Sequence, residues 1–167
     1  MTNKAPQRTT LLDGTPNHRD FQGHAGNVVT VVRLDAENVY SADDEGFIYV
    51  YDIVTGRLNK RLEGHVSGIW AMQYYHNILV SGSTDSTLRI WNLRALRPAY
   101  VFQGHASTVR AIEIVEPLLN PQTGNYEPPF PVIVTGSRDA TLRVWKLPGI
   151  DTLPVKFSLV LVSILTG

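Results

Sequence analysis

The sequence predicts an all-β fold made of about three similar four-stranded units, and two repeated features support this prediction. Gly-His pairs occur at positions 23–24, 64–65 and 104–105, so successive histidines lie 41 and 40 residues apart. Each pair is followed by a related block, which reads SADDEGFIYVYD from Ser41, SGSTDSTLRIWN from Ser81 and TGSRDATLRVWK from Thr135. No stretch shows convincing helical periodicity, so we expect the repeating unit to contain strands and turns only.

Short apolar runs and alternating segments predict the individual strands. Ile78–Val80 and Val132–Val134 are runs rich in β-branched residues and bounded by turn residues, which is typical of buried strands. The segments around Leu88–Trp91 and Leu142–Trp145 alternate instead, with apolar residues on one face. Arg89 and Arg143 occupy the opposite face, where we expect solvated side chains.

A Gly-His pair followed by a Trp-Asp-like end, at a period near 40 residues, is the sequence signature of a β-propeller blade. Three copies in phase predict a partial, open β-propeller of three WD-repeat blades at about 18–58, 59–98 and 99–148. The third repeat contains a Pro-rich insertion at 116–131, which predicts a surface loop. We expect an N-terminal segment at 1–17 and an apolar C-terminal tail at 149–167, both outside the repeats.

Composition excludes several classes of function. The formal net charge is zero, so no overall field draws the chain to nucleic acid or to an anionic membrane. The absence of cysteine excludes disulfides, Cys-ligated zinc and a Cys nucleophile. The apolar run Val155–Thr166 is shorter than the ~20 residues of a transmembrane helix, and Met1–Arg8 lacks the apolar core of a signal peptide. We therefore expect no cofactor, no nucleic-acid partner and no membrane.

The resemblance to WD repeats implies a buried hydrogen-bond relay in each blade. In such repeats the histidine of the Gly-His pair, a strand Ser or Thr, a turn Asp and a strand Trp are linked, because buried polar groups are costly unless they are paired. The matching residues are His65, Ser81, Asp85 and Trp91 in the second repeat, and His105, Thr135, Asp139 and Trp145 in the third.

The first repeat departs from the relay pattern. It keeps His24 and Ser41 but has Glu45 and Tyr51 at the Asp and Trp positions, so we expect the weakest blade here. Asp43 to Glu45 could bind a cation, but an exposed acidic turn is the favoured interpretation. The repeated histidines resemble a metal triad, and Ser, His and Asp resemble a catalytic set. Their fixed places in each repeat favour a structural role, with no metal and no catalysis.

Several longer phrases narrow the resemblance. PQRTTL at 6–11, GIWAMQY at 68–74, ILVSGSTD at 78–85, STVRAIEIVE at 107–116 and IVTGSRDATLRVWKLP at 133–148 carry it. The chain resembles the F-box/WD-repeat substrate receptors of SCF ubiquitin ligases, of the fungal cell-division-cycle type, over most of residues 5 to 148.

This resemblance implies a non-catalytic receptor that binds phosphorylated protein substrates through a phosphodegron, in ubiquitin-dependent degradation. Arg110 and Arg138 match two phosphate-contacting arginines of the family, and arginine suits this role because its planar fork forms paired, charge-assisted bonds with phosphate oxygens. The neighbouring pocket positions are matched by Trp70, Thr84, Ser107 and Thr108. The family also implies a nuclear or cytoplasmic location, with the nucleus favoured.

The chain also departs from the family. No F-box precedes Pro6, three repeats stand where eight are usual, a third phosphate-binding arginine is missing, and Ser86 replaces a basic residue. These departures keep two alternatives open: a generic WD-repeat scaffold of another assembly, and a non-functional gene fragment. We expect weak phosphopeptide binding, and self-association through the open blade faces. The tail VKFSLVLVSILTG has an aggregation-prone composition.

Overall fold

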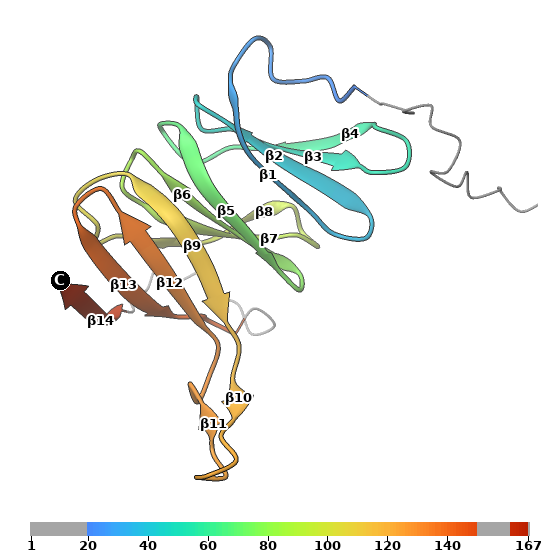
Figure 1. Ribbon diagram of the computed structural model, residues 1–167. Coiled ribbons are helices and arrows are strands. Elements are labelled where there is room, and N and C mark those ends of the chain that lie inside the picture. Colours follow the sequence, from blue (N-terminus) through green and yellow to red (C-terminus); the bar gives the residue numbers. More distant parts are fainter. Residues whose placement is uncertain (1–19, 150–160, 167) are drawn as a thin grey trace, which may run out of the picture.

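The computed structural model describes residues 20–149 and the backbone of 161–166 (Figure 1). These residues form three antiparallel four-stranded sheets that stand side by side, and one small two-stranded ribbon. The arrangement confirms the prediction of an all-β, open propeller of three blades. No helix in the described part of the chain is long and apolar enough to cross a membrane. The segment expected at 1–17 lies outside the described residues.

Each blade contains four strands. The first blade consists of β1 (Val29–Leu34), β2 (Asn38–Asp43), β3 (Ile48–Asp52) and β4 (Leu58–Leu62). The second consists of β5 (Ile69–Tyr75), β6 (Ile78–Ser83), β7 (Leu88–Asn92) and β8 (Arg97–Phe102). The third consists of β9 (Val109–Val115), β12 (Val132–Ser137), β13 (Thr141–Lys146) and β14 (Leu161–Thr166), and carries the ribbon of β10 (Leu118–Leu119) and β11 (Tyr126–Glu127).

The first strand of each blade lies innermost, and these inner strands link the blades. β5 contacts both β1 and β9, whereas the outer strands pair only within their own sheets. The run Ile78–Val80, predicted as a buried strand, lies in β6, whose six residues are all buried. A strand is buried along its whole length only where both of its faces are covered, and here neighbouring blades cover them.

The third blade extends further along the chain than the sequence predicted. Leu161–Thr166, placed in a tail outside the repeats, pairs with β13 as the fourth strand of the blade. The pairing is irregular between Val144 and Trp145, at the position where the second blade is irregular between Ile90 and Trp91. Residues 161–166 of the predicted tail therefore supply the fourth strand of the third blade, and the predicted end of the third repeat at 148 is too early.

The Pro-rich insertion forms the β10–β11 ribbon rather than an irregular loop. It projects from the end of β9, away from the three sheets (Figure 1). Its turn is closed by the Asn120 amide, which donates to the Asn125 carbonyl at 2.8 Å. Leu118, Leu119 and Tyr126 are exposed on it.

The hydrophobic core is divided between the two blade junctions. One cluster joins Tyr40, Ala42 and Ile48 of the first blade to Ile69 and Met72 of the second. The other joins the second blade to the third, and includes Val80, Leu88, Val109 and Ile112. Each blade is therefore stabilised mainly by its neighbours, as in other repeat proteins.

Candidate functional site

The relay residues predicted for the second blade lie together. His65 Nδ1 is 2.8 Å from Asp85 Oδ2, and His65 Nε2 is 2.8 Å from Ser81 Oγ. The Trp91 indole N–H donates to the same Ser81 oxygen at 2.8 Å. Ser81 is fully buried, so its hydroxyl has no access to a substrate. The set joins four chain segments and offers no nucleophile to the solvent.

The third blade repeats this arrangement. His105 Nδ1 lies 2.8 Å from Asp139 Oδ2, and His105 Nε2 lies 2.8 Å from Thr135 Oγ1. The Trp145 indole N–H donates to Thr135 Oγ1 at 2.8 Å. Threonine thus takes the place of serine without a change in geometry.

Electrostatics in the second relay favour a carboxylate beside a neutral imidazole. Burial lowers the pKa of His65 below its ordinary value of 6.5, although the Asp85 carboxylate acts in the opposite direction. Burial alone would raise the pKa of Asp85, but hydrogen bonds with His65 and Thr87 hold that pKa well below its usual range. The relay is therefore assembled best near neutral pH.

The first blade has a relay as well, built differently from the prediction. His24 Nε2 lies 2.7 Å from Ser41 Oγ, but its Nδ1 lies 3.1 Å from Oδ2 of Asp43, not from Glu45. Asp43 is completely buried and accepts the Phe47 amide N–H at 2.9 Å, whereas Glu45 is exposed. The assignment of Glu45 to the carboxylate position is wrong, and so is an exposed acidic turn at Asp43.

Two strand arginines also differ from the prediction. Arg89 and Arg143 were expected in solvent, yet the Nε atom of each is buried and forms no hydrogen bond within the described residues. Their guanidinium groups cover the Gly-His segments: a methyl group at Gly64 would lie 2.8 Å from Arg89 Nη1, and one at Gly104 would lie 2.7 Å from Arg143 Nη1. Both side chains therefore pack over their blades.

The predicted phosphate-binding residues gather where the inner strands begin. Trp70 is the second residue of β5 and Arg110 the second residue of β9, so they occupy equivalent positions in adjacent blades. The Arg110 guanidinium carbon lies 4.6 Å from the centre of the Trp70 ring. The Trp70 indole N–H donates to Thr84 Oγ1 at 2.8 Å. Three predicted residues thus form one connected set across the junction.

Arg138 stands beside this set on the β12–β13 turn. Its amide N–H donates to the Thr108 carbonyl at 2.9 Å, and the neighbouring Ser137 hydroxyl donates to the Ser107 carbonyl at 3.0 Å. Thr108 itself is buried, so the structure gives it a backbone role and keeps its side chain from the surface.

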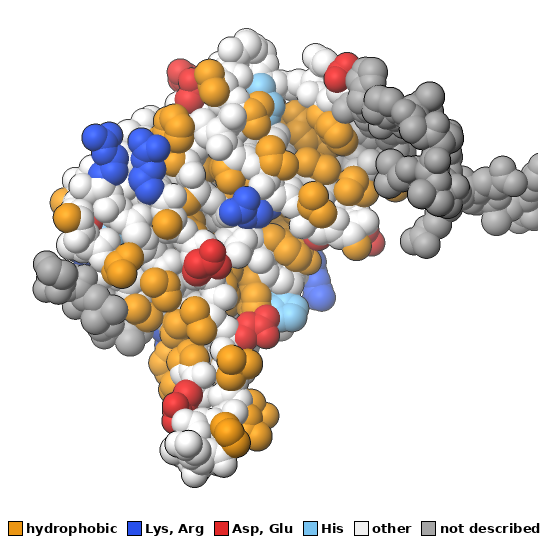
Figure 2. Space-filling model, viewed as in Figure 1, with side chains coloured by type: hydrophobic (Ala, Val, Ile, Leu, Met, Phe, Trp, Pro, Cys, Tyr) orange, Lys and Arg blue, Asp and Glu red, His pale blue; other side chains and the backbone are white. Residues whose placement is uncertain are grey.

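Arg110 and Arg138 line one open groove of about 270 Å³, which we call the arginine groove. Its other lining residues are Ala111, Gly136, Ser137, Ala140, Thr141 and Leu142. Basic side chains stand together at this end of the third blade in Figure 2. Neither guanidinium forms a salt bridge with a described residue, so both charges are available to a ligand.

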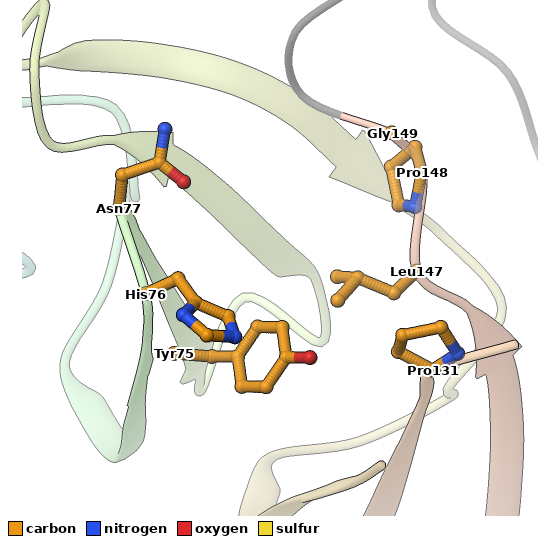
Figure 3. Close-up of a pocket in the computed structure, with 7 residues that line it drawn as sticks. All are labelled: Tyr75, His76, Asn77, Pro131, Leu147, Pro148 and Gly149. Carbon is orange, nitrogen blue, oxygen red and sulfur yellow. The ribbon is translucent and has the colours of Figure 1, made fainter. Parts of the chain in front are cut away.

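A second pocket, which sequence reasoning missed, lies at the opposite end of the same junction (Figure 3). It measures about 220 Å³ and is lined by Tyr75, His76, Asn77, Pro131, Leu147, Pro148 and Gly149. The rings of Tyr75 and His76 form one wall and Leu147 with Pro131 the other. It contains no Lys or Arg, so it does not suit a phosphate group. Among the described residues, no three His, Asp or Glu side chains are grouped so as to hold a metal ion.

The fold and its relays define an open β-propeller of the kind that mediates protein–protein contacts. The family model "WD domain, G-beta repeat" matches residues 56–92 and 96–146, and the chain therefore belongs to the WD40-repeat family.

Curated relatives agree with this assignment. The chain is 42% identical over 136 residues to the WD repeat-containing protein pop2 of Schizosaccharomyces pombe, covering 80% of this chain and 19% of the relative. It is 41% identical over 112 residues to Cell division control protein 4 of Saccharomyces cerevisiae, covering 66% and 13%. The corresponding Candida albicans protein is 41% identical over 140 residues, covering 81% and 20%. The chain thus spans a fifth or less of these relatives.

Solved structures are similar in fold. The computationally designed Ika4 protein superposes with a TM-score of 0.63 at 28% identity, covering 76% of this chain and 70% of that one. U3-55K superposes with a TM-score of 0.70 at 19% identity, covering 89% and 42%, which shows a common fold only.

Proposed function

We propose that this chain is part of the phosphodegron-binding surface of an SCF ubiquitin ligase substrate receptor, acting in ubiquitin-dependent protein degradation. A WD-repeat propeller is typically a non-catalytic interaction module. The 41% identity to Cell division control protein 4 of two yeasts supports a substrate receptor in particular. The observation that carries the proposal is the pair of exposed arginines on one groove, without acidic partners among the described residues.

The geometry suits a phosphorylated side chain. Arg110 reaches across the blade junction and rests on Trp70, and its side chain remains exposed. Arg138 projects from a turn whose backbone is anchored to Thr108. Two positioned arginines form charge-assisted bonds with a phosphate more effectively than two mobile ones, because less side-chain entropy is lost on binding.

The expected affinity of this chain alone is low. Hydrogen bonds to charged groups contribute about 1.5–3 kcal/mol each, while association costs an estimated 4–15 kcal/mol. The half-exposed Trp70 adds an apolar contact beside the phosphate. We therefore propose a partial recognition surface in the nucleus or cytoplasm, whose ligand is a phosphorylated protein.

Fluorescence polarisation of a labelled peptide carrying one phosphothreonine, against its unphosphorylated counterpart, tests this function. Only the phosphorylated peptide should bind, and Arg110→Ala and Arg138→Ala should each weaken binding at least ten-fold. Arg57→Ala, which removes an exposed arginine from the first blade, is the matched control and should have no effect. Equal binding of both peptides would favour a generic WD-repeat scaffold and would contradict the proposal.

A further inference from the structure

The insertion in the third blade is not needed to connect its strands. In the second blade, the equivalent strands β5 and β6 are joined by His76 and Asn77 alone. In the third blade, residues 116–131 stand between β9 and β12 and form the β10–β11 ribbon. Insertions within one repeat often lie on the face of a repeat protein that binds its partner. The ribbon is therefore a candidate for binding rather than for folding.

Large apolar side chains on the ribbon are open to solvent. Leu119 and Tyr126 stand directly opposite each other on the two antiparallel strands, so they lie side by side on one face of the ribbon. Leu119 is 57% exposed and Tyr126 is 60% exposed. Figure 2 shows hydrophobic side chains along the projecting ribbon and around its base. Contiguous apolar surface of this kind commonly marks a site of interaction with another protein.

The pocket of Figure 3 lies where the ribbon joins the blade. Pro131, the last residue of the insertion, lines this pocket together with Tyr75 and Leu147 on its two walls. Glu116, the first residue of the insertion, is also close: burial raises the pKa of Tyr75, and the Glu116 carboxylate raises it further. The volume of about 220 Å³ is below the roughly 300–1,000 Å³ of small-molecule sites. It suits a single side chain of a larger partner. We call the ribbon and this pocket together the ribbon surface.

The charge of the ribbon surface selects among partners. Residues 111–137 contain no Lys or Arg, but they contain three exposed glutamates, Glu113, Glu116 and Glu127. Lys146, which stacks on a ring at the base of the ribbon, offsets only one of these charges. An acidic surface repels nucleic acid and anionic membranes and attracts Lys and Arg. The partner that fits is therefore both apolar and basic.

We propose that the ribbon surface binds an extended segment of a partner protein, in which a large apolar side chain is flanked by Lys or Arg. The apolar side chain would fill the pocket between Tyr75 and Leu147. The basic residues on either side would pair with Glu116 and Glu127. An apolar anchor inside a pocket, with charged contacts at its rim, is the usual arrangement of a protein-binding site. Contact between the ribbons of two copies would instead bring like charges together.

The ribbon surface is separate from the arginine groove. Arg110 lies at the start of β9, whereas the ribbon follows the other end of the same strand. The two sites also have opposite charge, so a ligand suited to one is repelled by the other. One chain could therefore hold both ligands at once. The inference does not rest on the proposed function and is tested separately from it.

Selection of a phage-displayed library of random peptides on the full chain tests the proposal. We expect enrichment of peptides in which Leu, Phe or Trp is flanked by Lys or Arg. The most enriched of these peptides is then titrated by fluorescence polarisation at low and high salt. Its affinity should fall as salt rises, because attraction between exposed charges is screened. Failure to enrich such peptides overturns the proposal.

Variants at exposed positions locate the bound peptide. Glu116→Lys and Leu119→Ser should each weaken its binding at least ten-fold. Glu45→Lys and Leu58→Ser make the same changes at exposed positions of the first blade and should leave binding unchanged. His76→Asn removes part of one pocket wall and should also weaken binding, and asparagine tolerates the positive φ of 50° at this position.

Two further measurements keep the result unambiguous. Circular dichroism establishes that each variant is folded, and Glu116→Gln or Tyr126→Ser replaces any that is not. Arg110→Ala should bind the peptide at least as tightly as the wild type, because it alters only the arginine groove. A loss of binding in Arg110→Ala would place the peptide in that groove and overturn the proposal. Equal binding by the wild type and Glu116→Lys would overturn it as well.

Discussion

The Arg110 guanidinium carbon lies 4.6 Å from the centre of the Trp70 indole ring, so a cation of the third blade rests on an aromatic residue of the second. The indole is in turn fixed by its hydrogen bond to Thr84. Such a contact is worth about 0.5–2 kcal/mol, depending on solvation. The position of the Arg110 charge therefore depends on the blade junction as well as on its own strand.

Replacement of Trp70 should weaken phosphopeptide binding even though the tryptophan carries no charge. In Trp70→Leu the guanidinium loses its aromatic support, and we expect affinity to fall about two- to thirty-fold, in line with a cation–π contact of about 0.5–2 kcal/mol. Trp70→Phe keeps a ring and should retain most of the affinity. Polarisation titrations of both variants check this, and equal losses in both would contradict it.

Two glycines at equivalent positions should differ in their tolerance of a methyl group. Gly82→Ala places a Cβ 2.5 Å from Val109 Cγ1, so we expect a loss of about 1–3 kcal/mol of unfolding free energy through overpacking. At Gly136 the nearest atoms, Ala111 Cβ and Leu142 Cδ2, lie at 3.4 Å. Gly136→Ala should change monomer stability little, as measured by urea denaturation at low protein concentration.

The carboxylate of the first relay can be located by mutation. Asp43→Ala removes the acceptor for His24, Asn27 and the Phe47 amide, and each unpaired buried group costs about 1–3 kcal/mol. We expect a total loss of more than about 2 kcal/mol. Glu45→Gln, on an exposed side chain, should stay within about 0.5 kcal/mol of the wild type. If urea denaturation instead showed Glu45→Gln to be the less stable variant, the sequence-based assignment of Glu45 to the carboxylate position would be correct.

Stability should fall on acidification in two stages. The pKa of His65 is lowered by burial, so the folded state resists its protonation, and stability present above pH 6.5 is lost as the pH falls below that value. The pKa values of Asp43 and Asp85 are also lowered in the fold, so a further loss follows below pH 3.8. The midpoint of urea denaturation, measured between pH 7.5 and 5, should fall with pH and so report the first stage.

A pair of histidine variants identifies the group responsible. His65→Asn should be less stable at neutral pH but should show a flatter dependence between pH 7.5 and 5. His76→Asn, at an exposed histidine, should keep the wild-type dependence. An unchanged slope in His65→Asn would assign the first stage to another group.

The repeat spacing was sufficient to predict the blades, because a Gly-His pair and a Trp-ended strand recur wherever the same relay is built. It could not place the carboxylate of the first blade. Alignment assumes that each role keeps its position, yet Asp43, two residues earlier at the end of β2, reaches the same imidazole nitrogen. The buried position of Asp43 is visible only in three dimensions.

Two other features of the structure were not predicted from the sequence, for different reasons. The fourth strand of the third blade is separated from β13 by residues 147–160, so its partner could not be predicted from spacing. Hydrogen bonds between the inner strands, by contrast, have a regular interval: Arg33 Nε donates to Gln73 Oε1 at 3.2 Å, and Gln73 Nε2 donates to Glu113 Oε2 at 3.4 Å. These residues lie 40 apart and could have been found by aligning the inner strands, but the bonds themselves depend on how closely the blades pack.

The β10–β11 ribbon leaves the third blade at the far end of β9 from Arg110, and the chain returns through β12 before it reaches Arg138. Its turn, between Asn120 and Asn125, therefore lies beyond the end of the third blade that is opposite Arg110 and Arg138. A fluorophore or an affinity tag inserted at this turn would report on the chain or immobilise it without obstructing either arginine.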